Sequence, residues 1–421
     1  MEKLIIEHCS SLNGDVTISG AKNSSLPILA ACVLSKGEYQ INNLPKLRDI
    51  RTMLKLLNGL GIESDFNNNT ATLNNNDTLD FEAPYELVKT MRASILVLGP
   101  TLAKKGKAKV SLPGGCAIGE RPVDLHLSAL EKMGAKITVT EGYIYAECEK
   151  LTGTEIVFDK VTVTGTENIM MAATIAKGTT ILKNAAQEPE IKDLADFLRS
   201  MGAKIQGDGS TTIIIEGVDE LHSADYNVMS DRIEAGTFLC AVAAIGGKIT
   251  LHKAPVDAMD AIIEKLKNAG LKIEIIDNET IVAEMNGEIS AVDIVTAPYP
   301  GFPTDMQSQF MATMLKSNGV SVINESIFEN RFMHVPEMKR MGADITLNEH
   351  NAIVKGVSSF SGAHVMASDL RASAGLVIAG LMGDNSTVVH RIYHLDRGYE
   401  SFEIKLNNLG ANITRAQDDE W

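Results

Sequence analysis

Apolar positions along the chain alternate between helical spacing and short strand-like runs, and the two patterns follow each other in a fixed order. Leu194, Phe197 and Leu198 lie three and four residues apart ahead of Gly202, and a strand-like run covers residues 212–216. A glycine directly after a helix suits the left-handed backbone that ends many helices. The pattern predicts a helix that stops at a glycine and leads into two short strands.

The same combination occurs six times. The copies end at residues 64, 137, 205, 273, 345 and 413, at steps of 73, 68, 68, 72 and 68 residues. An earlier strand, an apolar helix such as residues 26–34 and a Gly-led strand such as residues 178–182 open each copy. Because five near-equal steps are a poor match to chance, we interpret the chain as six β-α-β-α-β-β repeats.

The spacing of the repeats divides the chain into two similar halves. Corresponding copies in the two halves lie 208 or 209 residues apart. Residues after Ile413 are too polar for a last strand, whereas Leu4 to Ile6 and Val16 to Ile18 are strand-like. We therefore expect an α/β fold of two three-repeat domains, one of residues 20–229 and one of residues 1–19 plus 230–421. Two crossings between them, near 19 and 229, would make a double hinge.

Composition narrows the class of protein. The 421 residues are 44% hydrophobic and carry a formal net charge of −15, which is typical of a folded acidic protein and argues against nucleic-acid binding or polybasic membrane docking. No uncharged span of 18 residues occurs, and the five cysteines contain no C-x-x-C pair. We expect a cytoplasmic monomer without a membrane segment, zinc site, disulfide framework or cofactor.

Polar or charged residues stand at the start of the first helix of each repeat. Asp and Asn are ordinary N-caps there, and we accept that explanation for Asp231 and Asp369. A cation in the first helical turn opposes the helix dipole unless an anion offsets it, so Lys22, Arg92 and Arg371 predict an anionic ligand. No Walker A or G-x-G-x-x-G motif occurs. The six clusters are Lys22-Asn23, Arg92, Glu167-Asn168, Asp231-Arg232, Asp305, and Asp369 with Arg371.

Residues 112–122 contain three glycines, three charged or thiol side chains and two prolines, which predicts a loop. Cys116 lies upstream of a helix expected to begin near Pro122, and Arg121 is close by. Both features favour a thiolate, so Cys116 is a candidate general acid or nucleophile. The alternative, a small buried apolar residue, suits Cys32 and Cys240 in their apolar runs.

Over essentially its whole length the chain resembles the UDP-N-acetylglucosamine enolpyruvyl transferases, also called UDP-N-acetylglucosamine 1-carboxyvinyltransferases. This resemblance implies two inside-out α/β barrels of three repeats each. It also implies transfer of the enolpyruvyl group of phosphoenolpyruvate to UDP-N-acetylglucosamine, the first committed step of peptidoglycan synthesis. The matching blocks are Ser19 to Asn23, the cysteine loop through His126, Asn184 to Glu190, Phe302 to Gln307, Phe328 to Phe332, Asp369 to Ser373 and His394 to Gly398.

The resemblance also implies roles for individual residues. Cys116 would be the general acid and Asp305 the base toward the sugar hydroxyl, with Lys22 and Arg397 completing the catalytic set. Lys22, Arg121 and Arg397 would contact phosphate, and Arg331 and Arg371 the carboxylate. The implied contacts to the UDP-sugar are Asn23, Arg92, Arg121, Pro122, Val123, Asp124, Leu125, Lys160, Val161, Thr162, Val163, Asp305 and Ile327.

Two positions in the UDP-sugar set leave alternatives open. His126 is either a contact on the uridine side or a satisfied helix histidine, and we favour the former slightly. Where the best-known family members continue with serine, valine and glycine after Lys160-Val161, this chain has Thr162, Val163 and Thr164. That departure weakens the expectation of backbone contacts to a diphosphate there.

Two competing functions remain at this stage. A 3-phosphoshikimate 1-carboxyvinyltransferase would share the fold and the chemistry, but that family lacks the cysteine loop. A catalytically silent sensor of UDP-sugars would not need Cys116, Asp305, Lys22 and Arg397 together. Both are therefore weaker interpretations than the enolpyruvyl transfer to UDP-N-acetylglucosamine.

Overall fold

The computed structural model describes residues 2–83, 85–88, 91–112 and 123–418. Cys116, Arg121 and Pro122, for which roles are predicted, lie outside the described residues. The described chain forms two compact units, one reaching from Gly20 to Met229 and the other made of the residues up to Ser19 and from Ser230 onward. Each unit is described below by itself.

Each unit holds three four-stranded sheets with one shared topology. The first strand of a repeat runs parallel to the second, which pairs antiparallel with the fourth, and the fourth pairs antiparallel with the third. The parallel pair is bridged by a helix, and the antiparallel hairpin follows a second helix. This arrangement confirms the α/β fold of six β-α-β-α-β-β repeats.

In the Gly20–Met229 unit the sheets are β14-β3-β5-β4 (Tyr226–Asn227, Gly37–Asn42, Thr70–Asn75, Ile62–Asn67), β6-β7-β9-β8 (Glu82–Ala83, Lys107–Ser111, Tyr143–Glu147, Lys136–Thr140) and β10-β11-β13-β12 (Glu155–Val157, Thr179–Lys183, Thr212–Glu216, Lys204–Gln206). Its helices are α1 (Lys22–Ala31), α2 (Arg48–Gly59), α3 (Tyr85–Val88), η1 (Arg92–Val97), α4 (Leu98–Lys105), α5 (Asp124–Lys132), α6 (Val163–Ala173) and α7 (Pro189–Ser200).

In the other unit the sheets are β2-β15-β17-β16 (Leu12–Thr17, Gly247–His252, Thr280–Met285, Lys272–Asp277), β18-β19-β21-β20 (Ile294–Val295, Val320–Asn324, Asn351–Lys355, Asp344–Asn348) and β22-β23-β1-β24 (His364–Met366, Thr387–His390, Glu2–Ile6, Ile413–Gln417). Its helices are α8 (Arg232–Ile245), η2 (Val256–Ala258), α9 (Asp260–Asn268), η3 (Thr304–Met306), α10 (Gln307–Met314), α11 (Val335–Arg340), α12 (Leu370–Met382), η4 (Ile392–Arg397) and α13 (Phe402–Asn408).

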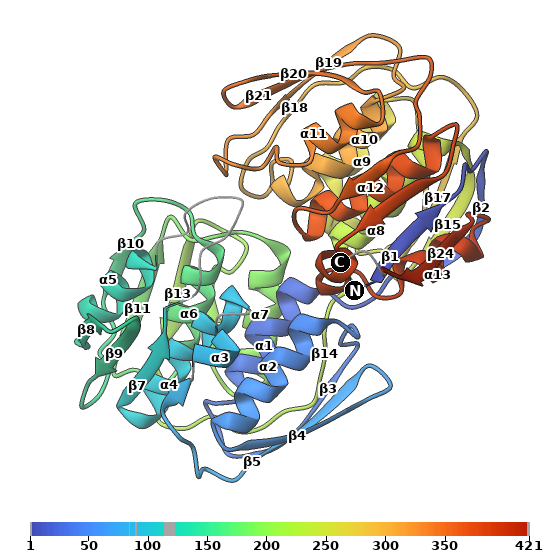
Figure 1. Ribbon diagram of the computed structural model, residues 1–421. Helices are drawn as coiled ribbons and strands as arrows, with labels where there is room; N and C mark the ends of the chain where they lie inside the picture. The colour runs from blue at the N-terminus through green and yellow to red at the C-terminus, as the bar shows by residue number, and fades with distance from the viewer. Residues whose placement is uncertain (1, 84, 89–90, 113–122, 419–421) are drawn as a thin grey trace. The chain divides into compact units, whose positions relative to one another are not determined.

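The first helices of the repeats form the centre of each unit, and the sheets lie outside them (Figure 1). α8, α10 and α12 contact one another, and every residue of α10 is buried. Such helices are buried on every side, polar residues included, so sheets and other helices surround them. α1 is likewise buried except at Asn23.

The glycine that follows each second helix has the predicted left-handed backbone. The six φ angles lie between 96° and 105°. Next to each glycine the last turn of the helix is closed by backbone bonds such as Ala203 N–H to the Leu198 carbonyl, 3.0 Å. The prediction of these helix ends is confirmed at Gly61, Gly134, Gly202, Gly270, Gly342 and Gly410.

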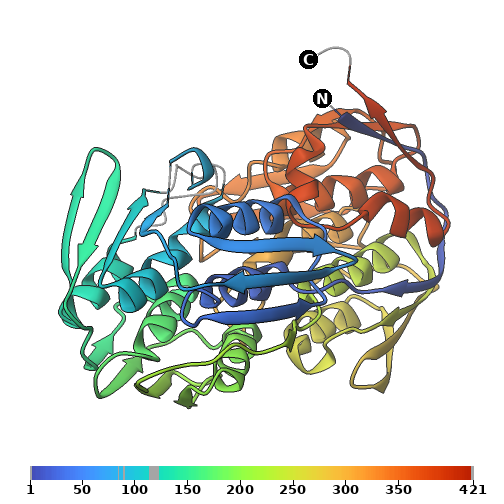
Figure 2. The same cartoon turned by 90° about the horizontal axis from the view of Figure 1, so that it is seen from below.

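Three sheets take a strand from outside the continuous repeat. β1 lies between β23 and β24, with Leu4 opposite both Val389 and Arg415, and β2 pairs parallel with β15 (Figure 2). β14, near the end of the Gly20–Met229 unit, supplies the parallel neighbour of β3. The sequence pattern did not reveal β14, because a strand of two residues has no hydrophobic periodicity.

One helix begins earlier than the sequence pattern predicts. α6 begins at Val163, because the Thr162 hydroxyl accepts a hydrogen bond from the backbone N–H of Gly165 (3.2 Å) and caps the helix. Glu167 and Asn168 therefore lie within the helix rather than at its start. Asp231 and Asp369 do cap α8 and α12, as predicted.

In the part of the chain that the structure describes, no helix is long and apolar enough to cross a membrane. The same residues contain no group of three or more His, Cys, Asp or Glu side chains arranged to hold a metal ion.

The hairpins pack closely against the ends of the central helices. A Cβ atom at Gly217, directly after β13, would lie 1.7 Å from the Ala176 carbonyl oxygen, whereas a Cβ at Gly287, after β17, would meet nothing within 4 Å. We expect Gly217→Ala to lower the free energy of unfolding by about 1–3 kcal/mol, because backbone must move to admit the methyl group. Gly287→Ala is the matched control and should change stability by less than about 0.5 kcal/mol. Denaturant unfolding of both variants tests this, and equal stability would contradict it.

Candidate active site

Asp305 lies at the centre of a charged cluster in the unit that contains α10 and α12. Its carboxylate accepts a hydrogen bond from Arg331 Nη2 at 2.9 Å and another from Arg371 Nε at 3.2 Å. The arginine side chains are only 5% and 1% exposed, while that of Asp305 is 27% exposed. The structure therefore brings together three of the residues predicted from sequence, with the carboxylate on the side open to solvent.

The start of α12 sets the position of Arg371. The Asp369 side chain accepts hydrogen bonds from the backbone N–H groups of Arg371 (2.9 Å) and Ala372 (3.0 Å). The Arg371 guanidinium carbon lies 5.3 Å from the centre of the Tyr399 ring, a cation–π distance. Cap and ring together hold the guanidinium group beside Asp305.

Gln309 supports the same cluster from α10. Its Nε2 atom donates to the backbone carbonyl of Asp305 and to the Tyr399 hydroxyl, each at 2.9 Å. The Tyr399 hydroxyl also contacts Thr237 Oγ1 at 3.0 Å. Sequence reasoning missed Gln309 and Tyr399. The i,i+4 spacing from Asp305 is a weak signal for Gln309, and nothing in the sequence marks Tyr399.

Several buried donors in this cluster have no protein partner in the described chain. They are Nη1 and Nη2 of Arg371 and Nη1 of Arg331, and both ring nitrogens of the wholly buried His334 are also unpaired. Burial, opposed by the charge of Asp369 and reinforced by that of Arg331, lowers the pKa of His334 to about 4. An unpaired buried donor costs about 1–3 kcal/mol. Guanidinium groups with free N–H donors can bind a planar anion such as a carboxylate through two parallel hydrogen bonds.

Arg397 is the last residue of η4, next to Gly398. A Cβ atom at Gly398 would lie 2.1 Å from Leu370 Cδ1 and 3.6 Å from Arg371 Nη1, so this turn lies directly against the start of α12. Burial, and secondarily the charge of Arg397, lower the pKa of His394 in the same turn. The end of η4 is thus a cationic segment packed beside Arg371.

The other unit carries the remaining predicted anion contacts. Lys22 is the first residue of α1 and is 8% exposed, with its Nζ 3.8 Å from Asp49 Oδ2 of α2. Asn23 follows it, and Arg92 is the first residue of η1. No side chain caps α1, and no acidic residue lies in its first turn. Lys22 therefore opposes the helix dipole, as predicted.

Residues 160–163 form the approach to α6. Lys160 and Val161 are exposed, Thr162 is the N-cap, and Val163 is the first helical residue. Among the other predicted contacts, Asp124 and Leu125 begin α5 after Val123, and the half-buried Ile327 donates its N–H to Glu325 Oε1 at 3.0 Å. The structure thus places these residues at helix starts or in loops.

His126 is buried inside the Gly20–Met229 unit, with 3% of it exposed. Asn168 Nδ2 lies 3.0 Å from its Nδ1, and Thr164 Oγ1 lies 3.3 Å from its Nε2. Because the amide NH₂ can only donate, Nδ1 accepts and Nε2–H donates to Thr164. Of the two alternatives for His126, the structure has the satisfied helix histidine. Thr164, the residue that departs from the family pattern, is its hydrogen-bond partner.

The cysteines expected to be structural are structural. Cys32 and Cys240 are wholly buried. Burial raises the pKa of the Cys240 thiol to about 12 and also raises that of Cys32. Neither thiol is available as a thiolate at neutral pH.

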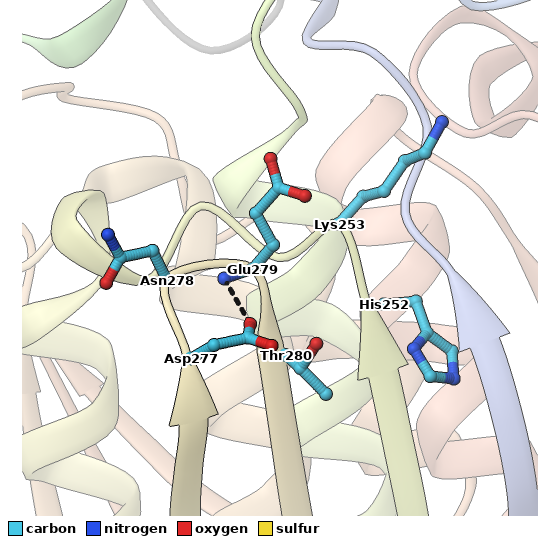
Figure 3. A pocket seen from close by; sticks show the side chains of 6 residues that line it. All are labelled: His252, Lys253, Asp277, Asn278, Glu279 and Thr280. Carbon is cyan, nitrogen blue, oxygen red and sulfur yellow. Dashed lines mark hydrogen bonds between the residues drawn. The ribbon is translucent and has the colours of Figure 1, made fainter.

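A surface depression of about 520 Å³ lies at the turn between β16 and β17 (Figure 3). Asp277 in that turn accepts a hydrogen bond from the N–H of Glu279 at 2.9 Å. The depression is lined by His252, Lys253, Asp277, Asn278, Glu279 and Thr280, none of which is a predicted site residue. We assign no function to it.

Comparison with known proteins defines the class first. Residues 6–406 match the family model described as EPSP synthase (3-phosphoshikimate 1-carboxyvinyltransferase). The enolpyruvyl transferase NikO of Streptomyces tendae superposes with a TM-score of 0.89 at 23% identity, covering 98% of each chain. EPSP synthase of Acinetobacter baumannii superposes with a TM-score of 0.76 at 20% identity, covering 99% of this chain and 100% of its own. At these identities the superpositions show the fold alone.

Closer relatives define the branch. Proteins named UDP-N-acetylglucosamine 1-carboxyvinyltransferase from Thermodesulfovibrio yellowstonii and Geotalea uraniireducens are 57% and 56% identical to this chain, and each comparison covers 99% of this chain and 100% of the relative. One from Solidesulfovibrio magneticus is 54% identical with the same coverage. The chain therefore belongs to the carboxyvinyltransferase family, in the branch of the UDP-N-acetylglucosamine 1-carboxyvinyltransferases.

The burial of His126 predicts a dependence of stability on pH. Burial lowers the pKa of His126 to about 4 from an ordinary value near 6.5, so the unfolded chain binds the proton more readily between these values. The contribution of neutral His126 is complete above about pH 6.5 and is lost as the pH falls toward 4, by about 3 kcal/mol.

His126→Gln should therefore lose less stability than the wild type between pH 6.5 and 4, as measured by denaturant unfolding at each pH. The exposed His350→Gln is the control and should follow the wild-type curve. Parallel curves for all three proteins would contradict the buried neutral state of His126.

Proposed function

We propose that this protein transfers the enolpyruvyl group of phosphoenolpyruvate to the 3′-hydroxyl of UDP-N-acetylglucosamine and releases phosphate. The observation that carries the proposal is the 57% identity, over the full length of both chains, to a protein named for this reaction. The unpaired donors of Arg331 and Arg371 support it, because the reaction needs a buried site for an anionic substrate.

The chemistry is an addition followed by an elimination. The sugar oxygen bonds to the central carbon of phosphoenolpyruvate while a proton is added to the methylene carbon and the hydroxyl proton is removed. Phosphate then leaves as the former methylene carbon gives up a proton. A general acid and a base on opposite sides of the reacting carbon suffice. We assign Cys116 as the acid and Asp305 as the base.

The charges of the substrate account for the cations. Phosphoenolpyruvate carries a phosphate and a carboxylate, and arginine offers planar donors to either group. We assign the phosphate to Lys22, Arg121 and Arg397 and the carboxylate to Arg331 and Arg371. Asp305 sits between the last two, at 2.9 and 3.2 Å, so a carboxylate bound to these arginines would lie beside the base.

The biological setting follows from the reaction. We propose a cytoplasmic enzyme of cell wall biogenesis that commits UDP-N-acetylglucosamine to peptidoglycan synthesis, on which cell shape and division depend. Its loop cysteine would form a covalent adduct with phosphoenolpyruvate and be alkylated by fosfomycin. We further propose that the enzyme works as a monomer.

The acceptor assay separates this function from its alternatives. Phosphate release from phosphoenolpyruvate should require UDP-N-acetylglucosamine, because the close relatives are named for that acceptor. Shikimate 3-phosphate should support no release above background. Activity with shikimate 3-phosphate alone would favour the 3-phosphoshikimate enzyme, and silence with both acceptors alongside UDP-sugar binding would favour the silent sensor.

Substitution of the assigned acid gives a second test. Cys116→Ser should lower kcat by at least about 100-fold, because a hydroxyl is too weak an acid at neutral pH, while the Kd for UDP-N-acetylglucosamine stays within about twofold. Fosfomycin should inactivate the wild type irreversibly and leave the residual activity of the variant unchanged. Cys32→Ala is the control, since Cys32 is wholly buried, and it should keep fosfomycin sensitivity. Full activity of Cys116→Ser would refute the assignment.

A further inference from the structure

Glu325 is a buried carboxylate with no cationic partner among the residues that the structure describes. It directly follows β19 and is 1% exposed. In the described chain its carboxylate accepts hydrogen bonds from neutral donors only. They are Thr296 Oγ1 (2.9 Å), Thr304 Oγ1 (2.8 Å) and the N–H groups of Ile327 (3.0 Å) and Phe328 (3.2 Å). Burial of a carboxylate is tolerated only when such bonds replace the lost hydration.

Three of the four donors belong to the two chain segments that supply the Asp305–Arg331 pair; the fourth, Thr296, directly follows β18 (Ile294–Val295). Thr304 is the residue before Asp305 and the first of η3. Ile327 and Phe328 begin the segment that leads to Arg331, whose guanidinium carbon lies 5.3 Å from the Phe328 ring centre. Glu325 therefore links the segment that carries Asp305 to the segment that leads to Arg331.

One of these bonds has no substitute nearby. The Thr296 side of the loop is also held by two bonds to the Thr296 backbone, which do not need its hydroxyl. The Thr296 N–H donates to the Asn324 carbonyl (2.9 Å), and the Ser326 hydroxyl donates to the Thr296 carbonyl. At Thr304, by contrast, the hydroxyl bond to Glu325 Oε2 is the one side-chain link to this carboxylate. Besides the Asp305–Arg331 ion pair itself (2.9 Å), this link joins η3 to residues 325–331, and it does so beneath the pair and away from the reacting groups.

We propose that Glu325, acting through Thr304, is a positioning residue that sets the geometry of Asp305 and Arg331 for enolpyruvyl transfer. This inference rests on the proposed function. Displacement of a reacting group by about 1 Å can lower the rate by about 100-fold. Loss of the Thr304–Glu325 hydrogen bond, which supports Asp305, should therefore lower kcat. Ground-state binding of the UDP-sugar uses many other contacts and should change little.

Two valine variants remove one hydroxyl each from the same carboxylate. Thr304→Val should lower kcat by about tenfold or more, with the KM for UDP-N-acetylglucosamine within about twofold. Thr296→Val is the matched control and should keep kcat within about twofold, because its side of the loop has other ties. Steady-state kinetics and Tm are measured on both. Loss of kcat in both variants in proportion to their loss of Tm would show a merely structural role and overturn the proposal.

Two substitutions of Glu325 itself test whether a conservative replacement preserves kcat. Glu325→Gln keeps one oxygen for the three donors on Oε1, and the Thr304 hydroxyl can rotate to accept from the new amide, so most of kcat should remain. Glu325→Ala leaves four donors unpaired and should lose kcat strongly if it folds. In a Glu325→Ala background, Thr304→Val should have no further effect on kcat.

The outcomes separate this inference from the function on which it rests. A wild type inactive with UDP-N-acetylglucosamine would overturn the proposed function itself. An active wild type with unchanged kcat in Thr304→Val would overturn only the positioning role of Glu325. If Glu325→Ala fails to fold, Thr304→Val and Thr296→Val still test the positioning role of Glu325.

Discussion

The central helices of each unit are buried on every side, and the remaining structure depends on covering them. α10 is buried along its whole length, and α12 is buried except at Leu370. A helix of this kind cannot lie at a surface, so the sheets must surround it. The same constraint determines where the charged side chains of the site lie. They are tolerated at the helix ends, where backbone N–H groups are unpaired. Lys22, Asp305 and Arg371 all lie at helix starts.

At those helix starts the local electrostatic potential is set by nearby cations, although the molecule as a whole is negatively charged. The chain carries a net charge of −15, which bears on solubility, yet Arg331 and Arg371 present unpaired buried donors around a single carboxylate. Besides the Asp369 cap, neutral groups support this arrangement: the Gln309 amide, the Tyr399 ring and the donors that surround Glu325. Neutral supports fix the position of a charge without cancelling it, so the cations remain available to an anion.

The repeated helices and strands could be predicted from the sequence, whereas elements that depart from the repeat could not. The helix-ending glycines and the strands 204–206 and 212–216 follow from spacing alone, because backbone conformation at these points is a local property. β14 is too short to leave a pattern, and the true start of α6 depended on the Thr162 cap. For His126 the sequence left a ligand contact and a satisfied helix histidine both open, because its partners, Asn168 and Thr164, lie about forty residues away in sequence and are visible only in the folded chain.

By itself the sequence determined the repeat, the class of fold and, through resemblance, the residue types that the reaction needs. It also marked Lys22, Arg92 and Arg371 as cations that a helix start would not carry without an anion. Only the tertiary structure decided which of these groups meet. Asp305 could have been an ordinary cap, but it is a carboxylate between two arginines. Glu325, Gln309 and Tyr399 became visible only there, because a hydrogen bond between distant segments depends on packing and leaves no periodicity in the chain.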